Sequence, residues 1–218
     1  MKKMLLFLSL IGMVSYTNAQ TGSGTIMIGG GLHFNNSTEK NTVAGSTTDG
    51  PKTTSFGINP RVGYFIGENF ALGVELGYSS DVTKENDPSP GVDETKNTSS
   101  TFSIAPFVRY YSPIAEKAGA FLNASVGYST GKNKFESTDA GGTTTSTDAD
   151  ISGFDAGITP GLYWFITQKV GLEASFGFIG FSSSKTSDDD DNETKTSNLD
   201  FELDTRTIGL GFHYYIGR

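Results

Sequence analysis

Hydrophobic residues alternate with small or polar residues in three long segments of this chain that read alike. The segments begin at Ile58, Ile104 and Ile158, and each opens with Ile-x-Pro, breaks at a short polar turn and alternates again. A period of two places successive side chains on opposite faces of a β-strand. Each segment therefore predicts a β-hairpin with one aliphatic and aromatic face and one face rich in glycine.

The first strand of the first hairpin illustrates the two faces. One face carries Phe56, Ile58, Pro60, Val62, Tyr64 and Ile66, and the other carries Ser55, Gly57, Asn59, Arg61, Gly63 and Phe65. The other two hairpins repeat this arrangement, and two more alternating strands lie near residues 26–34 and 207–216. The pattern predicts eight strands in total.

The connections between these strands alternate in length. Short turns fall near 66–69, 112–117 and 166–169, and long polar loops fall near 35–53, 80–99, 130–150 and 183–200. This alternation is typical of transmembrane barrels, and a closed sheet pairs every backbone group internally, as lipid requires. The sequence thus predicts an all-β fold, an eight-stranded antiparallel up-and-down transmembrane β-barrel that forms one domain over residues 20–218.

A soluble eight-stranded barrel that encloses an apolar ligand is the rival interpretation. It would expose the second face to water, yet that face holds much glycine and too few charges. Aromatic residues bound the aliphatic face at both ends: Tyr64, Tyr110, Trp164 and Tyr214 near the short turns, and Phe34, Tyr78, Tyr128 and Phe178 near the loops. Two aromatic bands are typical of the two membrane interfaces. We therefore expect the aliphatic face to contact lipid.

Three prolines, Pro60, Pro106 and Pro160, occupy equivalent positions in the three hairpins. Proline cannot donate a hydrogen bond to a neighbouring strand, and a closed barrel has no edge strand on which to place it. We therefore expect each proline to lie at a bulge or at a gap in the strand pairing.

Residues 1–19 have the pattern of a secretory signal peptide. A basic start precedes an apolar run that is too short to span a bilayer, and small residues end it, which predicts cleavage between Ala19 and Gln20. The chain has no cysteine, so disulfides, a lipid anchor on cysteine and cysteine-based metal sites are excluded.

The chain is acidic, with 16 Lys and Arg against 24 Asp and Glu and a formal net charge of −8. Nucleic-acid affinity comes from Lys and Arg, so we expect no nucleic-acid partner. Most of the net charge falls in the long loops, and the acidic run at 187–194 lacks the spaced ligands of an EF-hand. We expect these loops to be solvated and mobile, and to be where an extracellular ligand would bind.

Five charged residues have the parity of the inner face: Arg61, Glu75, Arg109, Asp155 and Glu173. A charge that faces lipid at the bilayer midplane costs roughly 2–4 kcal/mol, so these residues belong in the lumen. They form either an ion-pair network that fills the interior or a gate in which Arg61 and Arg109 exchange acidic partners. Eight strands leave room for little more than side chains.

The only histidines, His33 and His213, lie on the first and last strands. His33 is near the loop end and His213 near the opposite end, whereas metal binding or catalysis needs ligands that converge. We predict no catalytic, metal or cofactor site. A membrane-embedded hydrolase or acyltransferase is the enzymatic alternative.

The Ile-x-Pro strand, its short turn and the returning "NFALGVELGY" strand resemble the outer-membrane β-barrel domain family of small porin-like proteins, related to the OmpA transmembrane domain and OmpX. The resemblance covers the chain from Thr25 onward, and a mature start at Gln20 resembles exported proteins of Bacteroidota. It implies a Gram-negative outer membrane, periplasmic N- and C-termini, contacts with outer-membrane lipid and lipopolysaccharide, and the barrel-assembly machinery as a partner. The family's last strand usually ends on an aromatic residue, whereas here Gly217 and Arg218 follow Ile216.

Together these features predict a non-enzymatic outer-membrane protein with long acidic extracellular loops. Its role would be envelope-structural, or surface binding such as adhesion through the loops. The alternative is a narrow porin-like channel for ions or small solutes, gated by the lumen charges.

Overall fold

The computed structural model describes residues 21–43, 46–85, 92–188, 192–202 and 208–217. The predicted signal peptide and the cleavage site between Ala19 and Gln20 lie outside these residues. Within them, no helix is both long and apolar enough to cross a membrane.

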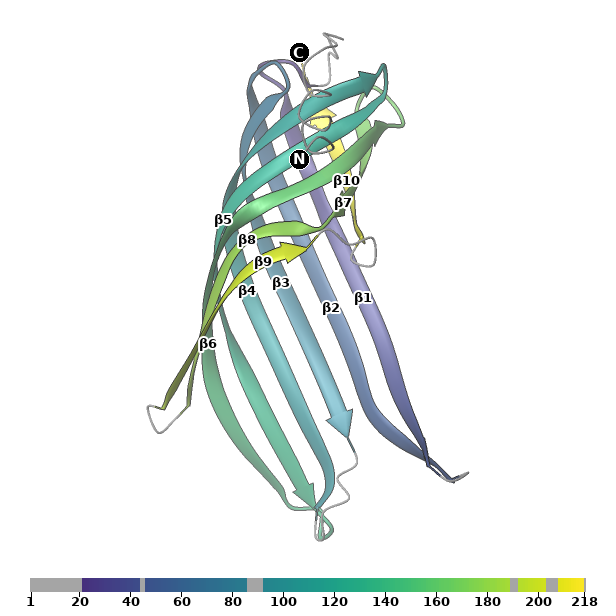
Figure 1. Cartoon of the computed structure of the whole chain (residues 1–218), viewed down its shortest axis with the longest axis vertical. Helices are drawn as coiled ribbons and strands as arrows, with labels where there is room; N and C mark the ends of the chain where they lie inside the picture. The colour runs from purple at the N-terminus through teal and green to yellow at the C-terminus, as the bar shows by residue number, and fades with distance from the viewer. Residues whose placement is uncertain (1–20, 44–45, 86–91, 189–191, 203–207, 218) are drawn as a thin grey trace, which may run out of the picture.

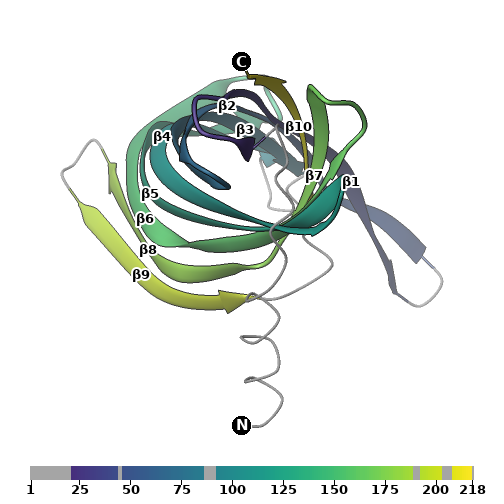
Figure 2. The ribbon, with the colours of Figure 1, turned by 90° about the horizontal axis from the view of Figure 1, so that it is seen from above.

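Ten strands account for nearly all of the described chain (Figure 1). They are β1 (Ile26–Val43), β2 (Ser46–Gly67), β3 (Phe70–Glu85), β4 (Val92–Ala115), β5 (Ala118–Asp139), β6 (Thr144–Phe165), β7 (Val170–Phe176), β8 (Phe178–Asp188), β9 (Glu193–Glu202) and β10 (Ile208–Ile216). Every pairing between them is antiparallel, and β1, β2, β3, β4, β5, β6, β7 and β10 close a ring (Figure 2). The predicted eight-stranded barrel is therefore confirmed.

The ring closes over the half of the barrel that bears the short turns. β1 pairs with β10 from Ile26 to Gly31, and β6 pairs with β7 from Gly161 to Phe165. Toward the other end β6 pairs with β8, and β8 pairs with β9. In the part of the chain that the structure describes, β9 and β1 do not pair, so the sheet spreads open at that end (Figure 2).

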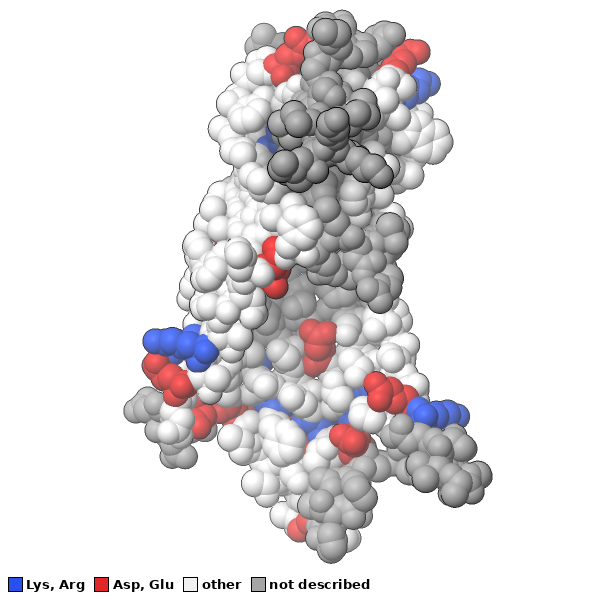
Figure 3. Space-filling view, in the orientation of Figure 1, with Lys and Arg blue, Asp and Glu red and all other residues white. Residues whose placement is uncertain are grey.

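The aliphatic side chains face outward. Val74, Val108 and Leu172 are 41%, 39% and 41% exposed, whereas the inward Arg109 and Glu173 are 1% and 5% exposed. The visible surface is mostly free of charge across the middle of the barrel, and charges gather toward the spread end (Figure 3). A soluble barrel would bury this face, so the soluble alternative is wrong.

The long polar connections differ from the prediction, because most of their residues continue the strands. β4 alone runs for 24 residues, and β5 and β6 stay paired out to Thr138 and Thr144. Cross-strand hydroxyl pairs accompany the extension, such as Thr53 with Thr83 at 3.2 Å between their Oγ1 atoms. Threonine favours strands, and such pairs stabilise them, which explains the error in predicting mobile loops. The acidic run at 187–194 lies partly outside the described residues.

All three prolines lie at a gap in the pairing, as predicted. The pairs that flank each gap are Ile58–Tyr78 and Arg61–Glu75, Ile104–Tyr128 and Phe107–Ser125, and Ile158–Ile179 and Gly161–Ser175. On its other edge each proline stays in register, opposite Gly30, Val74 or Leu122. The missing N–H thus removes a ladder hydrogen bond on one edge only. Of the three prolines, only Pro160 lies beside a shift in register.

The register shift beside Pro160 corrects one prediction. Gly177 joins β7 to β8 with a φ of +74°, a conformation that favours glycine. This extra residue inverts the alternation, so the ring of Phe178 lies on the inner side against Gly157, while Ile179 faces outward opposite Ile158. Phe178 does not belong to the outward aromatic band.

Candidate functional site

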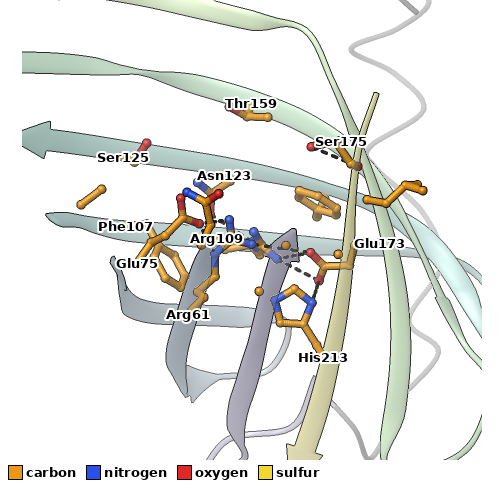
Figure 4. A pocket seen from close by; sticks show the side chains of 18 residues that line it. Arg61, Glu75, Phe107, Arg109, Asn123, Ser125, Thr159, Glu173, Ser175 and His213 are labelled. Carbon is orange, nitrogen blue, oxygen red and sulfur yellow. Dashed lines mark hydrogen bonds and ion pairs between the residues drawn. The ribbon is translucent and has the colours of Figure 1, made fainter. Parts of the chain in front are cut away.

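Four of the five predicted lumen charges come together at one level of the barrel (Figure 4). Arg61 of β2 and Glu75 of β3 are direct cross-strand partners, whereas Arg109 of β4 and Glu173 of β7 meet across the lumen. Strand alternation turns all four inward. Glu173 connects the two pairs, because its Oε2 also lies 3.7 Å from Nη1 of Arg61.

The Arg109–Glu173 pair is buried. Nη1 of Arg109 donates to Oε1 and Oε2 of Glu173 at 2.8 and 2.6 Å, and its Nε donates to Oδ1 of Asn123 at 3.0 Å. The hydroxyl of Tyr111 donates to Oε1 of Glu173 at 3.0 Å. The guanidinium carbon lies 4.3 Å from the ring centre of Phe121, a cation–π contact. A buried ion pair is favourable only when such extra bonds satisfy it.

The Arg61–Glu75 pair is partly exposed. Nε of Arg61 donates to Oε2 of Glu75 at 2.7 Å, and Nη2 donates to the same oxygen. Their side chains are 18% and 25% exposed. This pair faces water-accessible space in the lumen, whereas Arg109 and Glu173 lie beneath it.

Asp155 stands apart from these pairs. It lies on β6 opposite Gly127, and its carboxylate occupies the space above that glycine. Among the described residues it forms no ion pair with Arg61 or Arg109.

His213 is a member of the cluster that the sequence analysis missed. It is fully buried on β10, with Nδ1 3.4 Å from Oε1 of Glu173. The signal was its place on the strand that neighbours β7, where Gly211 lies opposite Glu173. His33 lies over Gly57 and is exposed. No cluster of three or more metal-ligating side chains occurs in the part of the chain that the structure describes.

Nine residues close the barrel beside the short turns, and we call them the aromatic plug: Met27, Phe65, Ala71, Phe107, Tyr111, Phe121, Tyr163, Phe165 and Tyr215. Tyr111 packs edge to face on Tyr163, with ring centres 5.1 Å apart, and its hydroxyl lies 3.3 Å from that of Tyr215. Beneath the plug, the backbone N–H of Asn69 donates to the carbonyl of Thr21 at 2.8 Å. This end of the barrel is therefore closed by packed side chains.

The alternation of the strands placed plug residues such as Phe65 on the inner face. It did not predict that rings from different strands would contact one another. The signal was a large aromatic residue at an inward position next to each short turn, such as Phe65 and Phe165. In an interior this narrow, rings from different strands at one level must touch.

A chamber of about 310 Å³ lies on the other side of the plug. Arg61, Glu75, Asn123, Ser125 and Thr159 contribute polar groups to its wall (Figure 4). The arrangement offers hydrogen bonds and balanced charge in a space that ends blindly at the plug. It can hold polar molecules.

One family model and several solved structures are similar to this chain. A family model described as outer membrane protein beta-barrel domain matches residues 18–186. No curated protein matches the chain. OprG from Pseudomonas aeruginosa is 12% identical, with a TM-score of 0.41, and the match covers 91% of this chain and 99% of that chain.

Two further solved structures are similar. Ail, the attachment invasion locus protein of Yersinia pestis, solved in complex with the heparin analogue sucrose octasulfate, is 15% identical with a TM-score of 0.42, covering 89% of this chain and 99% of that chain. Neisserial surface protein A is 15% identical with a TM-score of 0.36, covering 88% of this chain and 97% of that chain.

Proposed function

The chain belongs to the outer membrane protein β-barrel domain family, and from this premise we propose that it is a non-enzymatic, non-conducting protein that acts at the cell surface. Membership places it as an integral protein of the outer membrane. In such barrels short turns face the periplasm and long extensions face outward. Thr21, which bonds the β2–β3 turn, and the end of β10, which pairs with the start of β1, lie at the short-turn end, so the N- and C-terminal sides of the barrel are then periplasmic.

The aromatic plug is the observation that carries this proposal. A permeating ion would have to displace the ring of Tyr111, which is fully buried, and the Arg109–Glu173 pair beside it. Breaking a buried ion pair is strongly unfavourable. The plug therefore supports a structural role for these lumen charges over a gating role.

The strand extensions support action at the surface. The β1–β2, β5–β6 and β8–β9 hairpins continue past the aliphatic belt, and serine and threonine dominate their sequences. A paired, hydroxyl-rich extension is a rigid platform on which polar contacts with a ligand or with other envelope components can form.

Outward lysines on the extensions favour lipopolysaccharide as a partner. Lys52, Lys84 and Lys96 are direct cross-strand neighbours, beyond the outer aromatic band and on the same face. Lys84 pairs with Glu94 at 3.3 Å, and Lys96 and Lys134 hydrogen-bond Glu136 and hold the pKa of that carboxyl below its usual range, so carboxylates share this band with the lysines. Lysines at this level can reach headgroup phosphates. The barrel-assembly machinery as a partner stays a prediction.

Recording in planar bilayers tests the proposal. We expect the purified wild-type protein to insert without stable conductance, because the plug fills the lumen. Tyr111→Ala, which opens the centre of the plug, is expected to conduct, and Tyr110→Ala, one residue along on the lipid face, is the matched control. Steady conductance by the wild type that Arg109→Ala alters would instead establish the channel alternative.

A further inference from the structure

We propose that the chamber between the aromatic plug and the strand extensions binds a small, uncharged molecule of the saccharide class. The chamber measures about 310 Å³, at the lower end of the roughly 300–1,000 Å³ range of ligand pockets. It therefore suits a single sugar ring. This inference goes beyond the surface role proposed above and rests on it only in requiring the plug to be closed.

The wall of the chamber contains a glycine, Gly211, at a position where the fold would accept a side chain. Gly211 of β10 lies opposite Gly31 of β1, and both line the chamber. A Cβ on Gly211 would meet its nearest neighbours at 3.4–3.7 Å, which is ordinary van der Waals contact, and its φ is not positive. Neither steric crowding nor backbone conformation requires glycine at position 211. We attribute this glycine to the open space of the chamber beside it.

The charges around the chamber select a neutral ligand. Arg61 and Arg109 balance Glu75 and Glu173, so a charged ligand would leave one charge uncompensated in a site walled by protein. A zwitterion would have to compete with the bonds that join Arg61 to Glu75. A hydroxyl group both donates and accepts hydrogen bonds, so it can bond to the donor and acceptor atoms that the ion pairs do not use.

Several polar atoms in the chamber lack a partner within the described residues. Both bonds from Arg61 go to Oε2 of Glu75, which leaves Oε1 as an acceptor. Nδ1 and Nε2 of His213 are buried without a hydrogen bond, although Nδ1 lies 3.4 Å from Glu173. Buried polar atoms in native proteins are almost always bonded, so His213 indicates a missing partner at the floor of the chamber.

The remaining surfaces fit a sugar as well. Phe107 and Phe121 close the floor with apolar rings. Toward the extensions, Ser103 and Ser129 turn inward over Gly77 and Gly153, so hydroxyls line the approach beside the carboxylate of Asp155 over Gly127. A neutral polar molecule meets matching groups along this route and at its end.

Calorimetric titration of the full chain folded in detergent tests the proposal. The neutral probes are D-glucose, D-galactose and N-acetyl-D-glucosamine, and the charged probes are D-glucuronate, D-glucosamine and glycine. We expect saturable one-to-one binding of at least one neutral sugar, with every charged probe at least about tenfold weaker. Failure of all three neutral sugars to saturate, or equal binding of a charged probe, would overturn the proposal.

Variants locate the binding. Ser125→Leu fills the chamber and should weaken binding at least about tenfold, whereas Val126→Leu, next along β5 and facing lipid, should leave it unchanged. Thr159→Val removes one lining hydroxyl at nearly constant volume and should also weaken binding. It tests the chamber site if Ser125→Leu does not fold. Binding that a folded Ser125→Leu or Thr159→Val retains in full would refute the chamber site. A conducting wild-type barrel would refute the closed plug, a separate outcome.

Discussion

At the scale of single residues, the two arginines of the lumen differ in how far their side chains are buried. Arg109 is held by Glu173, Asn123 and the ring of Phe121, whereas Arg61 has one close carboxylate and remains partly exposed. Burial makes the two arginines unequal. The inner pair stabilises the closed end, and the outer pair forms a polar wall for the chamber.

Arg109→Leu should destabilise the barrel by about 3–5 kcal/mol, because it removes the nearest cation from the buried carboxylate of Glu173 and leaves only Arg61, at 3.7 Å. Arg61→Leu, on the partly exposed pair, should cost less than Arg109→Leu, because water can reach the carboxylate of Glu75. Urea unfolding in lipid vesicles measures both. Replacing Arg109 and Glu173 together by leucine should cost less than Arg109→Leu alone, and an additive loss would contradict the ion-pair account.

Residue parity predicted which charges face inward but not which of them meet. Arg61 and Glu75 are on adjacent strands, and their contact follows from the register of one hairpin. Arg109 and Glu173 are 64 positions apart and meet across the lumen, so their contact depends on the tilt and closure of the whole ring. A single sequence carries no local signal for that.

At the scale of elements, the strands are longer than the membrane needs. From Phe56 to Tyr64 the aliphatic belt spans about 26 Å along β2 at roughly 3.3 Å per residue, and the strand continues beyond it to Ser46. The sequence located this belt through its alternation. It did not reveal the extension, because hydroxyl-rich strands and hydroxyl-rich loops have the same composition and the difference lies in cross-strand pairing.

Gly177 fixes the junction of β7 and β8. Gly177→Ala should destabilise the barrel by about 1–2 kcal/mol, since a side chain is strained at its positive φ. Gly211→Ala, where a Cβ has room, is the matched control and should change the unfolding midpoint little. Equal unfolding midpoints for the two variants would show that the junction does not depend on glycine.

The β8–β9 hairpin should be separable from barrel assembly. Replacing residues 185–195 by Asn-Gly, a favoured two-residue turn, shortens the hairpin between Ser184 and Thr196, which are cross-strand partners. Because the hairpin tip is outside the ring, heat-modifiable gel migration should be unchanged. A shortened protein that no longer folds would mean that the tip contributes to closure.

At the scale of the whole molecule, the barrel has two unlike ends. The short-turn end is closed by the aromatic plug, and the other end spreads into paired extensions (Figure 1) that carry outward lysines. A net acidic chain that gathers lysine on one outward band has a surface suited to lipid phosphates on that side.

Substituting Lys52, Lys84 and Lys96 by glutamine should weaken binding to lipopolysaccharide by about 1 kcal/mol per lysine. Binding of the folded protein to vesicles that contain lipopolysaccharide measures the effect. Lys117→Gln with Lys169→Gln, in the short turns at the opposite end, is the control and should bind as the wild type does. If both variants bind equally, the lysine band does not contact the phosphates.

Every role described above requires the aliphatic face of the strands to meet lipid. Cysteine labelling in intact cells tests this directly, because the chain has no native cysteine. Ser125→Cys, in the chamber, should react with a membrane-impermeant maleimide added outside the cells. Val126→Cys, its neighbour on the outer face, should stay unlabelled within the bilayer. Labelling of Val126→Cys together with protection of Ser125→Cys would contradict the orientation of every strand described above.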